Sequence, residues 1–226
     1  MNMGDDAQLY YATAAFIATH FISSTPLRGV LVRGIGERAY LALYSLVAFA
    51  TLGWMIRAYN HAPLEPLWVG TRWLPAVVMP FSFILLACGL LSRNPTLVGA
   101  DKLLRNPEPA RGIIRVTRHP VMWSIMLWSL AHLLARGEHM ASVFFGGFFV
   151  VAALGALVLD QRKARTLGED WKRFAAVTSY LPFGAVLQGR NRFDGREIGW
   201  RNPTIGLALY ALFFWFHPLL FGIRAY

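Results

Sequence analysis

The sequence predicts an all-α membrane protein, a polytopic helical bundle with about six transmembrane helices. Of its 226 residues, 56% are hydrophobic and only 15% are charged, whereas soluble domains carry roughly 25% charged residues. Long uncharged apolar runs recur along the chain, and the basic residues gather between alternate runs. Because no repeat or composition break divides the sequence, residues 1–226 are expected to form one domain.

Six apolar runs approach the length of about 20 residues that a membrane-spanning helix needs. The first run is short and contains Thr13, Thr19 and His20, and the fourth is short but rich in Trp, Met and Leu. The third run is apolar despite Pro75 and Pro80, and the second, fifth and sixth are clear. The predicted spans are 9–24, 39–56, 74–91, 120–135, 141–159 and 204–223.

The positions of Lys and Arg predict the orientation in the membrane. Of the 22 basic residues, 18 fall in the three segments 25–38, 92–119 and 160–203, and only four fall in the other connections and at the carboxy terminus. Cytoplasmic loops carry the excess of Lys and Arg, so both termini are expected in the periplasm and the protein in a bacterial inner membrane. The acidic amino terminus lacks the basic start of a signal peptide, so we expect the first run to be retained.

The net charge of +10 is explained by this topology and by contact with anionic lipid. The basic residues sit in short loops, so no nucleic-acid partner is predicted; the expected partners are the lipid bilayer and an apolar, lipid-soluble substrate. The single cysteine, Cys88, rules out a disulfide, iron–sulfur cluster or thiolate zinc site within one chain. In the last basic segment, Gly168–Phe174 is predicted to be an interfacial helix with Trp171 and Phe174 on its apolar side.

Three histidines, His20, His132 and His217, lie within predicted spans, where ionisable residues are functional candidates. At 100° per residue, His20 shares a polar stripe with Thr13 and Ser24, and His132 lies near Trp128 and Ser129. Both stripes should face the bundle interior. Neutral imidazoles from facing helices can ligate a metal or a haem, or they can simply hydrogen-bond across helices.

A cluster of basic residues precedes the fourth predicted span. Pro120 is favoured at the start of a helix, and the positive end of that helix favours an anion. Arg111, Arg115 and Arg118, together with His119, are therefore predicted to form an anion-binding site. The anion could be a lipid phosphate or a ligand carboxylate.

Many short segments in a fixed order resemble the NnrU family of bacterial membrane proteins, which includes the plant and algal 15-cis-ζ-carotene isomerases. No segment is decisive alone, but together they extend from about His20 to Arg190. They are His20 with Ser23–Arg28, Gly36–Tyr40 with Leu43–Ser45, Arg111–Gly112, Thr117–Pro120 with Trp123, Trp128–His132, Asp160–Lys163, Gly168 with Trp171, Thr178–Ser179 with Pro182–Phe183, and Gly189–Arg190.

The resemblance implies a haem b whose iron is ligated by His20 and His132. A cysteine of the isomerase matches Ser129, so thiolate ligation is not expected in this chain. By residue count, His20 lies about 9 Å and His132 about 18 Å from the cytoplasmic end of its helix, whereas two axial ligands need similar heights. His119 is the alternative cofactor-binding residue. The implied activity is isomerisation of a ζ-carotene-type cis-polyene, or a role in denitrification and nitric oxide metabolism.

Two other functions compete with this one. Arg118–Pro120, followed by Gly168 and Trp171, also resembles the isoprenylcysteine and phospholipid methyltransferases that use S-adenosylmethionine. Those enzymes carry a Tyr soon after the Pro and a Glu near position 160, and this chain has neither. The third possibility is a non-enzymatic assembly or sensing factor, which a deletion strain grown on nitrate or nitrite would reveal.

The charge distribution predicts the outcome of a topology experiment. Green fluorescent protein fused after Arg105 or Arg190 should fluoresce, because these residues belong to basic segments that stay in the cytoplasm. Alkaline phosphatase fused after Tyr226 should be active, because the carboxy terminus is expected in the periplasm. A fluorescent fusion after Tyr226 would show that the number of spans is odd or the orientation reversed.

Overall fold

The computed structural model describes residues 3–63, 65–223 and 225, and the regular structure within them is helical. A single isolated bridge joins Pro66 to Glu138 in the described part of the chain. The all-α prediction is confirmed, and each predicted span overlaps one long helix. These helices are α1 (Met3–Ile22), α3 (Glu37–His61), α4 (Leu74–Leu91), α6 (Pro120–Arg136), α7 (His139–Leu167) and α11 (Arg201–Phe221).

Four of these helices, α3, α4, α7 and α11, are long and apolar enough to cross a membrane by length and composition. Only 11% of the most apolar stretch of α3 and 6% of that of α11 is buried inside the protein. Phe49, Trp215 and Leu219 are more than 70% exposed. Apolar surface of this extent is unfavourable in water but is solvated by lipid, so the chain is a membrane protein. Spans at α1 and α6, which would bring the number to six, remain a prediction.

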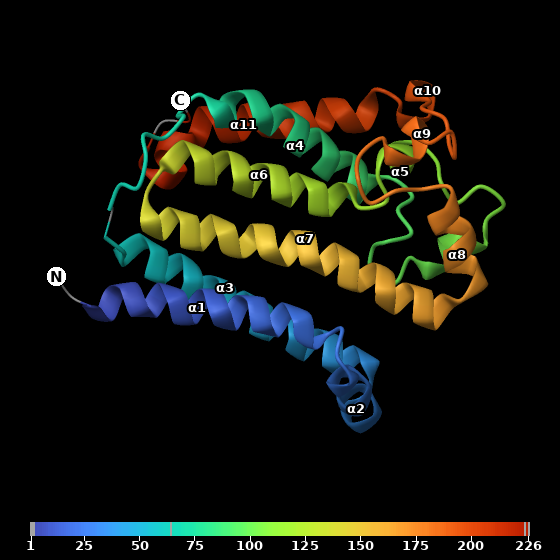
Figure 1. The fold of residues 1–226 in the computed structure, drawn as a ribbon, viewed down its shortest axis with the longest axis horizontal. Coiled ribbons are helices and arrows are strands. Elements are labelled where there is room, and N and C mark those ends of the chain that lie inside the picture. The colour runs from blue at the N-terminus through green and yellow to red at the C-terminus, as the bar shows by residue number, and fades with distance from the viewer. Residues whose placement is uncertain (1–2, 64, 224, 226) are drawn as a thin grey trace.

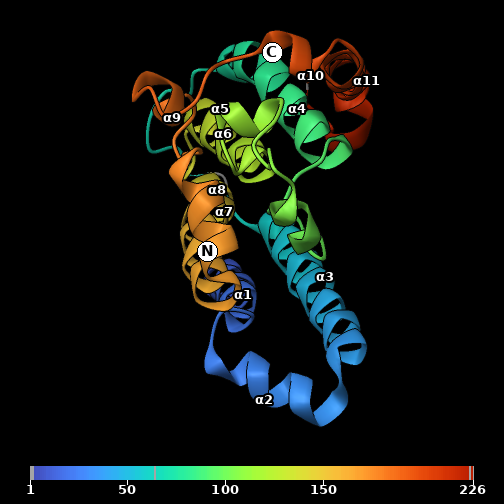
Figure 2. The ribbon, with the colours of Figure 1, turned by 90° about the vertical axis from the view of Figure 1, so that its right-hand side faces the viewer.

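The long helices form an elongated bundle with α7 at its centre (Figures 1 and 2). Helix α7 packs against α6 on one side and α1 on the other, α4 packs against both α6 and α11, and α3 packs against α1. Two glycines allow close approach of backbones: a Cβ at Gly206 would lie 2.6 Å from the Phe83 carbonyl oxygen, and one at Gly89 would lie 2.8 Å from the Val121 side chain. Small residues at helix interfaces are typical of membrane bundles.

The three basic segments lie together at one end of the bundle, on the right in Figure 1. They fold into short helices that cover the ends of the long ones: α2 (Pro26–Ile35), η1 (Asp101–Arg105), α5 (Ile113–Val116), α8 (Glu169–Ala176), α9 (Gly184–Leu187) and α10 (Gly195–Ile198). Trp171 and Phe174 of α8 are buried in a small core with Ile114 and Cys88. The predicted apolar side of this helix is therefore confirmed, and it packs on protein.

An ion pair between Arg115 and Glu197 joins α5 to α10 at this end. The guanidinium donates from Nε to Glu197 Oε2 at 2.7 Å and from Nη2 to Oε1 at 2.9 Å, and the Gly112 N–H also donates to Oε2 at 2.9 Å. These hydrogen bonds from Arg115 are the largest cause that lowers the pKa of the Glu197 carboxyl to about 2, while partial burial opposes the shift. The pair ties together segments 82 residues apart in sequence.

Glu197→Gln should destabilise the protein because it leaves the Arg115 guanidinium without its counter-charge. Loss of a charge-assisted hydrogen-bonded pair costs about 2 kcal/mol, which lowers the Tm by about 4–8 °C in a chain of this size. Because the folded pKa of Glu197 lies below 4.5, its stabilising effect is present above pH 4.5 and is lost as the pH falls towards 2.

Thermal unfolding in detergent at pH 7 and pH 3 tests this prediction, with Glu169→Gln as the matched control. Glu169 pairs with Lys172 on the surface, where both side chains are largely exposed, so its loss should change the Tm little. Equal Tm values for the two variants at pH 7 would contradict the stabilising role of the Arg115–Glu197 pair.

Candidate functional site

His20 lies in the last turn of α1 with its imidazole folded back along its own helix. Nδ1 lies 2.7 Å from the Phe16 carbonyl oxygen, and because a carbonyl only accepts, Nδ1 carries the proton. The ring packs against Phe16 at 4.3 Å and against Tyr44 of α3 at 6.2 Å between centroids. No described residue bonds to Nε2, so its lone pair is available.

His132 repeats this arrangement on α6. Nδ1 donates to the Trp128 carbonyl oxygen at 2.8 Å, and the described residues offer Nε2 no partner. The imidazole stacks on Phe145 of α7 with centroids 5.3 Å apart and also contacts the Trp128 ring at 5.5 Å. Both candidate ligands thus donate from Nδ1 to a carbonyl of their own helix and leave Nε2 without a partner among the described residues.

The helices that carry the two histidines meet at Phe148 of α7. Its ring lies 5.0 Å from that of Phe16 on α1 and 5.0 Å from that of Trp128 on α6. Helix α1 runs parallel to α7, since Tyr10 contacts His139 and Phe16 contacts Phe148. Helix α6 runs antiparallel to α7, to which it is joined by the short turn at Gly137.

This opposite direction places the two histidines on opposite sides of the level of Phe148. Each histidine lies four residues beyond the ring that contacts Phe148, so their Cα atoms lie about 6 Å to either side of that level. Both side chains lean towards the amino end of their own helix, as the bonds to the carbonyls four residues earlier require. The direction of the side chains therefore offsets part of this separation of about 12 Å between the Cα atoms, and a common height for the two imidazoles stays a prediction.

The imidazoles of His20 and His132 are donors of the kind that would ligate a haem iron, and haem binding stays a prediction. A metal-ligating histidine usually donates its second ring N–H to a carbonyl or carboxylate, which fixes the tautomer, and His20 and His132 both do so. Within the described residues there is no group of three or more His, Cys, Asp or Glu that could hold a metal ion, but a haem takes only its axial ligands from the protein. Ser129, three residues before His132, is fully buried, and its hydroxyl donates to the Met126 carbonyl oxygen at 3.1 Å.

His119 lies apart from these residues, at the basic end of the bundle. Its Nε2 lies 2.7 Å from Asp160 Oδ1, and Arg118 donates from Nε to Oδ2 of the same carboxylate at 2.8 Å. His119 is 1% exposed, and its Nδ1 is buried with no hydrogen-bond partner among the described residues. The Asp160 carboxylate therefore joins the start of α6 to the carboxy-terminal half of α7.

The residues predicted to bind an anion separate into two groups. Arg111 and Arg115 approach Glu197, at 3.8 and 2.7 Å, whereas Arg118 and His119 pair with Asp160. The three guanidinium groups, which the sequence suggested would converge on one ligand, thus pair with carboxylates of this chain instead. Anion binding by these residues stays a prediction, and the structure gives the guanidinium groups internal partners.

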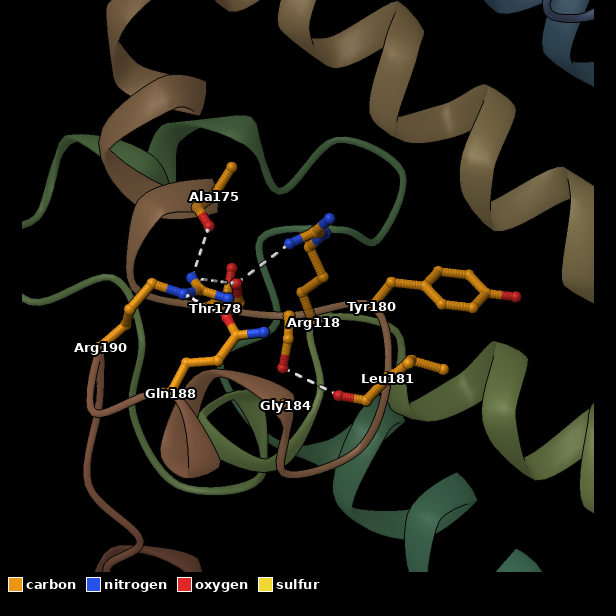
Figure 3. A pocket seen from close by; sticks show the side chains of 9 residues that line it. Arg118, Ala175, Thr178, Tyr180, Leu181, Gly184, Gln188 and Arg190 are labelled. Atoms are coloured by element: carbon orange, nitrogen blue, oxygen red, sulfur yellow. Dashed lines mark hydrogen bonds between the residues drawn. The ribbon is translucent and has the colours of Figure 1, made fainter.

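A shallow hollow of about 380 Å³ lies beside Arg118 (Figure 3). Arg118 and Arg190 both donate to the Thr178 carbonyl oxygen, at 3.2 and 2.9 Å, and Arg190 also donates to the Ala176 carbonyl. These bonds satisfy carbonyls at the carboxy end of α8. Both guanidinium groups are therefore used to fix the loop after α8.

Sequence reasoning missed Asp160 as a member of a site. Its one signal was its position as the first charged residue after the apolar run 141–159. An acid at the end of a transmembrane run can be solvated by water, so position alone did not identify His119 as its partner. The partner, His119, stands at the start of the preceding helix α6, 41 residues earlier in the chain.

The NnrU protein family model matches residues 8–225. The 15-cis-zeta-carotene isomerase of Arabidopsis thaliana is 28% identical over 214 residues, covering 87% of this chain and 56% of that protein. The isomerase of the same name from Zea mays is 33% identical over 112 residues, covering 48% of this chain and 31% of that protein. Both relatives are described as chloroplastic, and no solved structure matches. The chain spans about half the length of the Arabidopsis relative. Since the family match covers nearly the whole sequence, the chain belongs to the NnrU family.

Proposed function

We propose that this protein isomerises a cis double bond of an apolar polyene of the ζ-carotene type, and that it binds haem b through His20 and His132. Membership of the NnrU family and similarity to two carotene isomerases support the activity. The observation that carries the cofactor is the matched pair of imidazoles. Each has Nδ1 bonded to a carbonyl of its own helix and Nε2 without a protein partner in the described chain.

Haem iron with imidazole ligands supplies one-electron chemistry when it is bound. The contribution of the chain is to orient the ligands and to exclude water. The Phe16 and Trp128 carbonyls fix both ligand tautomers. The Phe16, Phe148 and Trp128 rings make their surroundings apolar.

Trp128 also connects the proposed haem site to an apolar surface on the other side of α6. With Met79, Phe83 and Leu86 of α4 it lines a hollow of about 170 Å³ between α4 and α6. The one hydrogen bond of Ser82, from its hydroxyl to the Ser124 carbonyl oxygen at 2.8 Å, is internal. A polyene dissolved in the bilayer could contact this surface without crossing water, which suits a substrate with no polar groups.

A role in denitrification is a separate proposal that uses the same site. A haem with an exchangeable imidazole ligand could bind nitric oxide. A deletion strain that grows normally on nitrate and nitrite would leave the isomerase as the proposed role.

Haem binding and isomerisation should depend on the same two histidines. Protein purified in detergent and supplied with haem b should show a Soret band. Loss of a contact that only supports a metal ligand weakens metal binding by about 10- to 100-fold. His20→Ala and His132→Ala should each weaken haem binding by more than this, because each removes an iron ligand. The same variants should no longer convert 15-cis-ζ-carotene in vesicles, as measured by chromatography.

His139→Ala is the matched control. His139 is bonded to Tyr10 at the other end of the bundle, so it should keep both the Soret band and the conversion. Wild-type protein without a Soret band would reject the haem. Wild-type protein that binds haem but leaves 15-cis-ζ-carotene unchanged would reject the isomerase and retain the haem site.

A further inference from the structure

A second group of basic side chains at the same end of the bundle differs from the paired arginines described above. It lies where α1, α2, α3 and α7 meet, one turn beyond His20. We call it the Arg28–Arg162 cluster, and its members are Ser23, Arg28, Tyr40, Tyr44 and Arg162. Arg28 lies over the Tyr40 ring at 5.5 Å, and Tyr40 stacks on Tyr44 at 6.2 Å. Arg162 of α7 reaches the same cluster through its bond to the Ser23 carbonyl oxygen at 3.2 Å, and burial, followed by the charge of Arg28, lowers its pKa.

The hydrogen-bond donors of this cluster are mostly unused. A guanidinium group carries five N–H donors, and the described residues accept one bond from Arg162, at the Ser23 carbonyl oxygen 3.2 Å away. Arg28 donates once, to Glu37 at 3.2 Å, and that carboxylate is 65% exposed. By contrast, Arg115 donates to Glu197 twice and to Asn191 once.

Tyr40 adds a further unsatisfied group. It is 3% exposed, and its hydroxyl is buried with no hydrogen-bond partner among the described residues. A buried polar atom without a partner is unfavourable, and two nearby guanidinium groups repel each other. Asp101, whose charge acts on Arg162, is already bonded to Lys163. One bound oxyanion would satisfy the Tyr40 hydroxyl and offset the repulsion.

The position of the cluster defines the kind of molecule that would carry this oxyanion. His20 precedes Ser23 by three residues, lies deeper in the bundle, and contacts Tyr44 through its ring. A ligand that reaches both places has an apolar body inside the bundle and an anionic group at the membrane surface. Guanidinium groups bind carboxylates and phosphates through paired hydrogen bonds.

We propose that Arg28 and Arg162, with the Tyr40 hydroxyl, bind the oxyanion of an amphipathic ligand whose apolar body lies beside His20. The carboxylate side chains of haem b and the phosphate of an anionic lipid share this chemistry. If the oxyanion is a carboxylate of haem b (the haem form), the inference rests on the proposed function. If it is a lipid phosphate (the lipid form), the inference does not.

A comparison of haem b with its dimethyl ester tests the haem form, because the ester keeps the macrocycle and iron but lacks the negative charges. Soret titration of the purified full-length protein should give a Kd at least about tenfold lower for haem b than for the ester. Arg28→Gln and Arg162→Gln should bring the ratio of the ester Kd to the haem b Kd close to one without weakening ester binding. Tyr40→Phe should lower this ratio in part. Arg33→Gln and Arg165→Gln remove the same charge from exposed positions of the same two helices, so they should retain the preference.

The lipid form is tested on the same variants without haem, in nanodiscs that contain equal amounts of phosphatidylglycerol and phosphatidylcholine. Native mass spectrometry should show phosphatidylglycerol retained by wild type and by Arg165→Gln but lost from Arg162→Gln. This result alone would identify a lipid phosphate as the source of the oxyanion. Equal Kd values for haem and ester, together with no preference for phosphatidylglycerol, would overturn the proposal. If wild type binds no haem, the proposed function fails, and the lipid measurement still decides whether the oxyanion site exists.

Discussion

The lack of water inside a bilayer is the constraint on which this structure depends. Backbone N–H and C=O groups must then find partners within the chain, and helices achieve this locally. The same constraint favours polar side chains that bond to carbonyls of their own helix, as the imidazoles of His20 and His132 do. The same bond leaves Nε2 of each ring without a partner among the described residues. The bond from Nδ1 to a carbonyl lowers the cost of placing these histidines in an apolar bundle. It is also the supporting bond that a metal-ligating histidine usually makes.

The charged end of the bundle satisfies its basic groups in two different ways. Arg115 and Arg118 are paired with Glu197 and Asp160, and these pairs join segments that are distant in sequence. Arg28 and Arg162 leave most of their donors without partners among the described residues, near Tyr40, whose hydroxyl is buried and likewise unpartnered there. Pairing with an internal acid fixes a loop, whereas unused donors near His20 are suited to a ligand.

The helices could be predicted because an apolar run of sufficient length in lipid has one stable backbone form. The run 74–91 coincides with α4, and 120–135 differs from α6 by one residue. The tautomers of His20 and His132 depend on carbonyls four residues away, so they follow from helical geometry. The partners of Arg115 and His119 could not be predicted, since Glu197 and Asp160 lie 82 and 41 residues away. Neighbouring arginines suggested one anion site, but long-range packing divided them between two carboxylates. The tilt of both imidazoles towards Phe148 also required knowledge that α1 is parallel to α7.

The central claim is that one iron lies between two imidazoles from α1 and α6. Low-temperature electron paramagnetic resonance of the ferric, haem-loaded protein tests it directly, because two strong-field imidazole ligands give a low-spin centre. We expect a low-spin signal from the wild-type protein. A high-spin signal from fully loaded wild-type protein would show that at least one of the two imidazoles does not reach the iron, and would contradict the account.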